Sequence, residues 1–137
     1  MRDLTLDHIG IAVRSIDEGL GVYRALGLEP TAIEDVPEQG VRVAFLSVGG
    51  STLELLEPSG PDSPIARHLR RRGPGLHHIC LNVTDIDAAM TRLRSSGYRL
   101  LSEEPQPGAH GCRVCFVHPK STGGVLIELS EPAVEGS

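Results

Sequence analysis

The chain has 137 residues, a length that suits one compact domain. Its formal net charge of −5 at pH 7 argues against nucleic acid or an anionic membrane surface as a partner. No apolar run approaches the length of a membrane span, and charged residues stand near the N-terminus, so we predict a cytoplasmic protein without a signal peptide. The odd number of cysteines predicts free thiols rather than disulfides.

The first half of the chain predicts a strand, a helix and three further strands. Alternating apolar residues indicate a strand over residues 4–13. Ser15 or Asp17 is expected to cap a helix that ends at Gly27. Further strands are predicted near residues 31–36, 41–48 and 52–57, followed by a short helix over residues 65–72.

The second half repeats this order. We predict a strand over residues 76–83 and a helix over 86–96, which begins after Thr84 or Asp85 and is closed by Gly97. Strands are predicted near residues 99–102, 113–117 and 125–129. The chain is therefore interpreted as one α+β domain over residues 1–137. It consists of two tandem βαβββ modules, 4–58 and 76–132, joined by a linker over 59–75, and they form a curved, partly open mixed sheet with the helices outside.

The two halves are also similar in sequence. Residues 8–27 read HIGIAVRSIDEGLGVYRALG and residues 78–97 read HICLNVTDIDAAMTRLRSSG, with seven identities at a shift of 70. A second pair, GGSTLELLEP at 49–58 and GGVLIELSEP at 123–132, aligns at a shift of 74. Each half thus carries a histidine at its start and a glutamate near its end. Such duplication predicts a site at the seam between the two copies.

The matched residues are His8 and Glu54 in one half, and His78 and Glu128 in the other. A carboxylate within an apolar strand is costly unless it is paired or ligated. A single glutamate of this kind is commonly an edge residue that faces water, but two at matched places, each with a matched histidine, favour a metal site. Two imidazoles and two carboxylates suit one divalent ion per chain, Co²⁺, Mn²⁺, Ni²⁺, Fe²⁺ or Mg²⁺ with Zn²⁺ possible, and leave positions for a substrate that reacts through an enolate.

Several motifs between Leu6 and Glu131 resemble those of the vicinal oxygen chelate superfamily, and within it those of the methylmalonyl-CoA epimerase family. They are DHIGIAV, PEQGV, ELLEP, DSPIA, GLHHI, GAHG and HPKSTGGVLIEL. The resemblance implies an enzyme that removes and returns the α-proton of methylmalonyl-CoA through a metal-stabilised enolate. It also implies an acyl-CoA thioester as the substrate, a homodimer, and the same four residues as metal ligands.

The chain departs from some members of that family at two positions. Those members carry a glutamate that is not a metal ligand a few residues after PEQG, and a glutamine at the matching ligand position, whereas this chain has Val43 and Glu54. We hypothesise that Glu54 and Glu128 are the catalytic acid–base pair, because epimerisation needs a proton donor and acceptor on opposite faces. Metal ligation weakens a carboxylate as a base, and a ligand that partly dissociates or uses its second oxygen would resolve this.

Substrate contacts are expected in two loops. His110 lies in a glycine-rich loop and can touch the thioester, although a loop histidine is commonly just solvated. Lys120, Ser121 and the following glycines can hold the CoA phosphates through a charge and open backbone N–H groups, or form a plain turn. The run 70–72 of arginines, with Arg67, can also attract CoA phosphates, but a solvated face that favours a helix C-terminus is the preferred interpretation.

Two other functions remain open at this point. One is a glyoxalase-like isomerase that acts on a thiol adduct of a ketoaldehyde. The other is a metal-free binding protein of the bleomycin-resistance type, against which the four ligands argue. An extradiol dioxygenase is disfavoured, because it normally uses one carboxylate and keeps more positions open for O₂.

Overall fold

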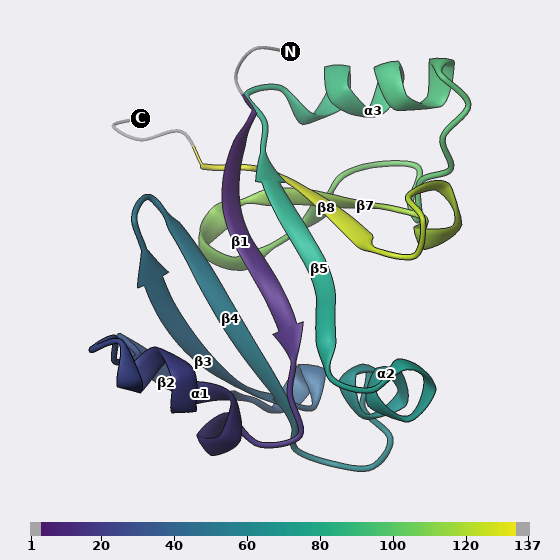
Figure 1. Ribbon diagram of the computed structural model, residues 1–137. Helices are drawn as coiled ribbons and strands as arrows, with labels where there is room; N and C mark the ends of the chain where they lie inside the picture. Colours follow the sequence, from purple (N-terminus) through teal and green to yellow (C-terminus); the bar gives the residue numbers. More distant parts are fainter. Residues whose placement is uncertain (1–3, 134–137) are drawn as a thin grey trace. The chain divides into compact units, whose positions relative to one another are not determined.

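The computed structural model describes residues 4–133 (Figure 1). By its internal contacts this part of the chain divides into two compact units. The N-terminal unit is His8–His77, and the C-terminal unit combines the residues before His8 with those from His78 onward. None of the helices in residues 4–133 is long and apolar enough to span a membrane.

The N-terminal unit contains a mixed sheet with two helices. Strand β1 pairs in parallel with β4, and β4-β3-β2 continue as an antiparallel meander. The elements are β1 (Thr5–Ala12, whose first residues belong to the other unit), α1 (Ile16–Ala25), β2 (Ala32–Val36), a 3₁₀ turn η1 (Pro37–Gln39), β3 (Val41–Val48), β4 (Ser51–Pro58) and α2 (Pro64–Arg72).

The C-terminal unit repeats the same arrangement. Strand β5 pairs in parallel with β8, and β8-β7-β6 are antiparallel. The α+β class and the repeated strand-helix-strand-strand-strand order are therefore confirmed. The elements are β5 (Gly75–Asn82), α3 (Ile86–Ser95), β6 (Gln106–Pro107), the 3₁₀ turn η2 (Ala109–Gly111), β7 (Arg113–Val117), the 3₁₀ turn η3 (Pro119–Ser121) and β8 (Leu126–Glu131).

The predicted strand over residues 99–102 is wrong. This segment forms only an isolated bridge between Leu100 and Val117, and the outer strand is the two-residue β6. Beyond this bridge, the Arg94 guanidinium donates to the carbonyl oxygens of Ser102, at 3.0 Å, and Glu103. These bonds satisfy the two carbonyl groups without a neighbouring strand, so the segment can leave the sheet at this point.

Both long helices begin in the same way. The Ser15 hydroxyl accepts from the Glu18 N–H at 3.3 Å at the start of α1, and the Asp85 carboxylate accepts from the Ala88 N–H at 3.0 Å at the start of α3. These bonds select Ser15 and Asp85 from the alternative caps that the sequence offered.

A second glutamate of each copy also supports a helix start. The Glu57 carboxylate accepts from the Ile16 N–H at 2.8 Å, and the Glu131 carboxylate accepts from the Ile86 N–H at 2.9 Å. A carboxylate at a helix N-terminus satisfies an otherwise unpaired amide and complements the helix dipole. The final glutamates of ELLEP and ELSEP are therefore structural.

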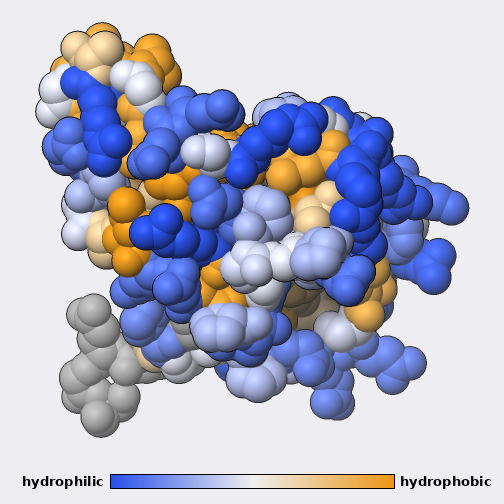
Figure 2. Space-filling view, turned by 90° about the horizontal axis from the view of Figure 1, so that it is seen from below, coloured by the Kyte–Doolittle hydropathy of each residue, from blue (hydrophilic) through white to orange (hydrophobic). Residues whose placement is uncertain are grey.

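The core of the N-terminal unit lies on both faces of its sheet. Helix α1 packs on one face, where Ile16 and Leu20 are buried against Leu55 and its neighbours. Helix α2 packs on the opposite face, with its apolar side chains buried there. In the space-filling view, hydrophobic side chains form separate groups among hydrophilic ones rather than one large apolar patch (Figure 2).

The core of the C-terminal unit is built around α3. Ile86 and Met90 of this helix pack against Cys115 and Leu129. The three cysteines are free, as predicted, and Cys80 and Cys115 are buried. Burial raises the pKa of the Cys115 thiol to about 11, so this thiol is a core side chain rather than a nucleophile.

Candidate metal centre

The N-terminal unit brings His8 and Glu54 together. In the parallel β1–β4 pair, Gly10 lies opposite Glu54. His8 is two residues before Gly10, so both side chains project from the same face of the sheet. The His8 Nδ1 atom lies 3.5 Å from a Glu54 carboxylate oxygen, and the two side chains are only 14% and 19% exposed.

The C-terminal unit brings His78 and Glu128 together with the same offset. In the parallel β5–β8 pair, Cys80 lies opposite Glu128, and His78 is two residues before Cys80. A ring nitrogen of His78 and a carboxylate oxygen of Glu128 lie within 4.8 Å of each other. In each module, therefore, a histidine and a glutamate lie on two neighbouring parallel strands. In both modules the glutamate lies opposite the second residue after the histidine.

The donor atoms of His8 and Glu54 are spaced to fit a divalent cation. Ligand atoms that are each about 2.1 Å from an ion lie roughly 3–4 Å apart. The 3.5 Å separation of His8 and Glu54 agrees with this spacing. An imidazole nitrogen and a carboxylate oxygen are also a donor set that first-row transition metals and Mg²⁺ share. Each pair can thus supply two ligands to one ion.

An apolar wall stands beside the His8–Glu54 pair. Phe45 lies opposite Glu54 on the neighbouring strand, and Val43 lies opposite Leu56. Val43 is only 4% exposed and belongs to a buried cluster that includes Leu56. The position where some family members carry a glutamate is therefore occupied here by a packed apolar side chain, and it supplies no acid–base group.

The glycine-rich loop holds His110 in an unusual backbone conformation. Among the described residues other than glycine, His110 alone has a positive φ, at 58°. Its neighbour Gly111 also has a positive φ, of 76°. A bulky residue with this conformation is uncommon, and such residues concentrate at functional sites. The side chain of His110 is exposed.

The loop of Lys120 and Ser121 is a closed turn. The Lys120 N–H donates to the His118 ring at 3.1 Å, and the Ser121 N–H donates to the His118 carbonyl at 2.9 Å. The expectation of open amides at these two residues is therefore wrong, because His118 accepts both hydrogen bonds. The Lys120 side chain itself is exposed.

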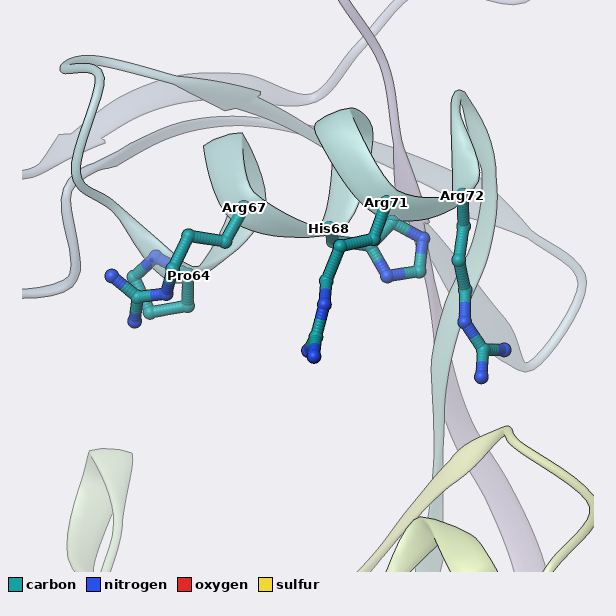
Figure 3. A pocket seen from close by; sticks show the side chains of 5 residues that line it. All are labelled: Pro64, Arg67, His68, Arg71 and Arg72. Atoms are coloured by element: carbon teal, nitrogen blue, oxygen red, sulfur yellow. The ribbon is translucent and has the colours of Figure 1, made fainter.

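The hollow on helix α2 was not predicted from the sequence. It has a volume of ≈ 180 Å³ and is lined by three arginines together with Pro64 and His68 (Figure 3). Two of them, Arg67 and Arg71, are four residues apart, a spacing that places them on one helix face. This spacing is the sequence signal for a cluster of arginines on one helix face, and the sequence interpretation favoured a solvated surface there.

Comparison with known proteins identifies the family. Residues 7–116 match the model of the glyoxalase/bleomycin resistance protein/dioxygenase superfamily. The human mitochondrial methylmalonyl-CoA epimerase is 44% identical over 128 residues, which cover 92% of this chain and 73% of that protein. The ethylmalonyl-CoA/methylmalonyl-CoA epimerase of Cereibacter sphaeroides is 45% identical over 129 residues, which cover 92% and 96%.

A solved structure agrees with these relatives. A variant of the methylmalonyl-CoA epimerase from Streptomyces coelicolor, in complex with 2-nitronate-propionyl-CoA, is 42% identical and superposes with a TM-score of 0.80. The match covers 95% of each chain. The chain therefore belongs to the glyoxalase/bleomycin resistance protein/dioxygenase superfamily and, within it, to the methylmalonyl-CoA epimerase family.

Proposed function

We propose that this chain interconverts the two epimers of methylmalonyl-CoA. The observation that carries this proposal is the matched histidine–glutamate pair of each unit, in a chain whose relatives are named for this reaction. A bleomycin-resistance type of binder has no use for these four donors. A glyoxalase-like isomerase shares the donor set, but the relatives over most of the chain are epimerases.

We further propose that His8, Glu54, His78 and Glu128 hold one divalent ion per chain. The equal register of the two pairs supports this, since two copies of one module supply equivalent ligands to a shared centre. Two carboxylates neutralise the charge of such an ion. When bound, Co²⁺, Mn²⁺, Ni²⁺ or Mg²⁺ supplies Lewis-acid polarisation of the substrate carbonyl, which makes the adjacent α-proton more acidic.

The two glutamates are the proposed acid–base pair. Epimerisation removes the α-proton toward one face of the substrate and delivers a proton to the other face, so two groups must share the task. Each unit contributes one carboxylate. Val43 is packed in the apolar cluster and supplies no carboxylate. Glu54, which lies opposite Phe45 on the neighbouring strand, is therefore the proposed base of the N-terminal unit. Its second oxygen can take the proton while the first remains a ligand.

The remaining substrate contacts are proposed in the C-terminal unit. The constrained backbone of His110 holds an imidazole that can donate to the thioester. Lys120 offers its exposed ammonium to a CoA phosphate, and the Ser121 hydroxyl can donate beside it. We also infer a homodimer from the family resemblance, and light scattering of the purified protein measures this directly.

Proton exchange in D₂O tests the reaction. Each epimer of methylmalonyl-CoA is incubated with metal-free protein and with added Co²⁺, Mn²⁺ or Mg²⁺, and loss of the α-proton is followed by NMR. Exchange of both epimers with added metal, together with no turnover of a methylglyoxal hemithioacetal, is the expected result. Hemithioacetal turnover without α-proton exchange would contradict the proposal. Ethylmalonyl-CoA is a second substrate to test, because it appears in the name of the Cereibacter sphaeroides relative.

A further inference from the structure

The two phenylalanines of the chain lie at matched positions in the two units. In the N-terminal unit, Phe45 lies directly opposite Glu54 on the neighbouring strands β3 and β4 (Figure 1). In the C-terminal unit, Phe116 on β7 lies directly opposite Glu128 on β8. The sequence contains two phenylalanines in all, so both are cross-strand neighbours of a glutamate that we propose as metal ligand and base.

The strand register, rather than the sequence repeat, produces this match. Glu54 and Glu128 align at a shift of 74, whereas Phe45 and Phe116 align at a shift of 71. The connection from β7 to β8 is longer than the connection from β3 to β4, and this difference accounts for the change of shift. The similarity of the two halves therefore does not reveal the pairing, but the antiparallel ladders do.

Each ring projects from the same face of the sheet as its glutamate. Residues directly opposite each other on antiparallel strands point to the same side, with Cβ atoms about 4.5–5.5 Å apart. The residues next to Phe45, Ala44 and Leu46, are buried in the cluster around α1, so Phe45 lies on the other face. Cys115, next to Phe116, is buried in the cluster around α3, which places Phe116 on the face away from α3.

Both phenylalanines are only partly buried. Phe45 packs against the cluster that contains Val43 and Leu56, but part of its side chain remains accessible. A carboxylate is stabilised by polar or cationic neighbours, whereas an apolar ring at this distance excludes water from it. A ring beside a half-buried glutamate therefore contributes little to the stability of the carboxylate, and the arrangement occurs twice. This points to an apolar group of a ligand as the partner of the two rings.

The other cross-strand neighbour of each glutamate is small. Gly10 lies opposite Glu54 on β1, and Cys80 lies opposite Glu128 on β5. Each carboxylate thus has a small residue on one flank and a phenylalanine on the other. Of these two neighbours, the ring is the one large enough to limit what can lie beside the carboxylate.

An alkylmalonyl thioester carries an apolar group next to its reacting carbon. The proposed function places that carbon within hydrogen-bond reach of both carboxylates, about 3 Å. A substituent on the carbon therefore lies within contact distance of the rings beside these carboxylates. The substrate carbonyl is polarised by the proposed ion, whereas the alkyl group is the part of this end of the substrate that gains from an apolar surface.

We propose that Phe45 and Phe116 determine which substituent on the α-carbon is accepted. Their rings contact a short alkyl group and exclude a long one. This inference rests on the proposed function, since it names specificity-determining residues of the same site. The substrate class is then a malonyl thioester with one short alkyl substituent.

A series of substituents tests this assignment. Malonyl-, methylmalonyl-, ethylmalonyl- and butylmalonyl-CoA are assayed for α-proton exchange in D₂O with added Co²⁺, and exchange without protein is subtracted. The unaltered chain should exchange the butyl ester at least tenfold more slowly than the methyl ester, and Phe45→Ala and Phe116→Ala should each reduce this ratio about tenfold. Malonyl-CoA has no substituent for the rings to contact, so its exchange should stay within about threefold of the unaltered chain.

Two further sets of variants keep the test interpretable. Phe45→Leu and Phe116→Leu retain most of the apolar volume, so they preserve the fold where an alanine variant does not, and they should change the ratio in the same direction. Tyr23→Ala and Tyr23→Leu are the matched controls. Tyr23 is also a partly buried aromatic residue, but it packs against the cluster around α1, on the other face of the same sheet. Its variants should keep the order of rates of the unaltered chain.

A binding measurement separates failure of this inference from failure of the proposed function. The same four esters are titrated calorimetrically, with added Co²⁺, into the unaltered chain and each variant. A shift of relative affinity toward the butyl ester in the Phe45 and Phe116 variants supports the assignment even if no α-proton exchange is found. An unchanged order of affinities in the folded variants of either phenylalanine overturns it. So does an equal shift in the Tyr23 controls, which would attribute the effect to a general loss of packing.

Discussion

Replacement of Glu54 by glutamine separates metal binding from proton transfer. Glutamine keeps an oxygen that can ligate an ion but removes the basic carboxylate. Because Val43 is 4% exposed within an apolar cluster, the position that carries a glutamate in some relatives supplies no substitute base. Loss of a positioned general base lowers a rate about 10²–10⁴-fold. The dissociation constant for the metal should change far less than this.

The assay follows each epimer separately in D₂O. If Glu54 and Glu128 serve opposite faces of the substrate, Glu54→Gln should lose α-proton exchange from one epimer and retain it from the other. The rate of interconversion should fall by about 10²–10⁴-fold. Glu29→Gln is the control, since Glu29 is exposed and pairs with Arg24 on the surface. Calorimetry with Co²⁺ on the same samples verifies that the metal is still bound.

A compensating variant makes the test stricter. Val43→Glu combined with Glu54→Gln reproduces the arrangement that some family members carry. Insertion of a carboxylate among these apolar side chains costs several kcal/mol of stability unless it is paired, but it should recover at least tenfold of the lost rate. Near-normal exchange of both epimers in Glu54→Gln would refute the assignment of the base. A loss of rate in proportion to the loss of bound metal would also refute the assignment.

The remaining predictions concern stability. Glu57→Ala removes the acceptor at the start of α1 and should lower the free energy of unfolding by about 1–2 kcal/mol in a urea titration. Gly40→Ala should cost about 1–3 kcal/mol, because φ is 67° and a Cβ atom there would lie 2.7 Å from the Ser63 Cβ. Gly21→Ala, with no atom within 4 Å of the added group, should instead stabilise α1 by about 0.5–1 kcal/mol. Burial lowers the pKa of His77 to about 4 from 6.5, so the folded metal-free chain binds fewer protons than the unfolded chain between these values. The free energy of unfolding of the metal-free chain should therefore fall by on the order of 1–2 kcal/mol as the pH falls through that range, after discounting for partial exposure. The variant His77→Gln should lack this part of the pH dependence. Equal melting temperatures for the two glycine variants, or parallel pH curves for His77→Gln and the unaltered chain, would contradict these expectations.

The sequence predicted most elements of both modules because each of these has a strong local signal. Alternating apolar residues mark the strands, and Gly27 and Gly97, both at positive φ, follow the two long helices. The repeat also predicted that each histidine has a glutamate partner. The structure shows why, since the partner lies opposite the second residue after the histidine in both parallel strand pairs.

Other features depend on contacts that sequence patterns do not record. The Arg94 guanidinium donates to the carbonyl oxygens of Ser102 and Glu103, where the predicted strand is missing, and no local preference indicates these bonds. The His118 ring accepts the Lys120 amide, which closes a loop that seemed open from its glycines. The four-residue spacing of Arg67 and Arg71 is visible in the sequence, but the hydrogen bond from the Arg70 guanidinium to the Pro61 carbonyl is not. In each case a specific hydrogen bond, rather than a pattern of residue types, distinguishes the structure from the prediction.

The shared metal centre is the claim on which the proposed chemistry depends. Crystals of the chain grown with Co²⁺, with anomalous diffraction recorded at the cobalt edge, test it most directly. One anomalous peak per chain, about 2.0–2.2 Å from a nitrogen of His8 and of His78 and an oxygen of Glu54 and of Glu128, is the predicted result. A peak held by one pair alone, or by other residues, would contradict the account.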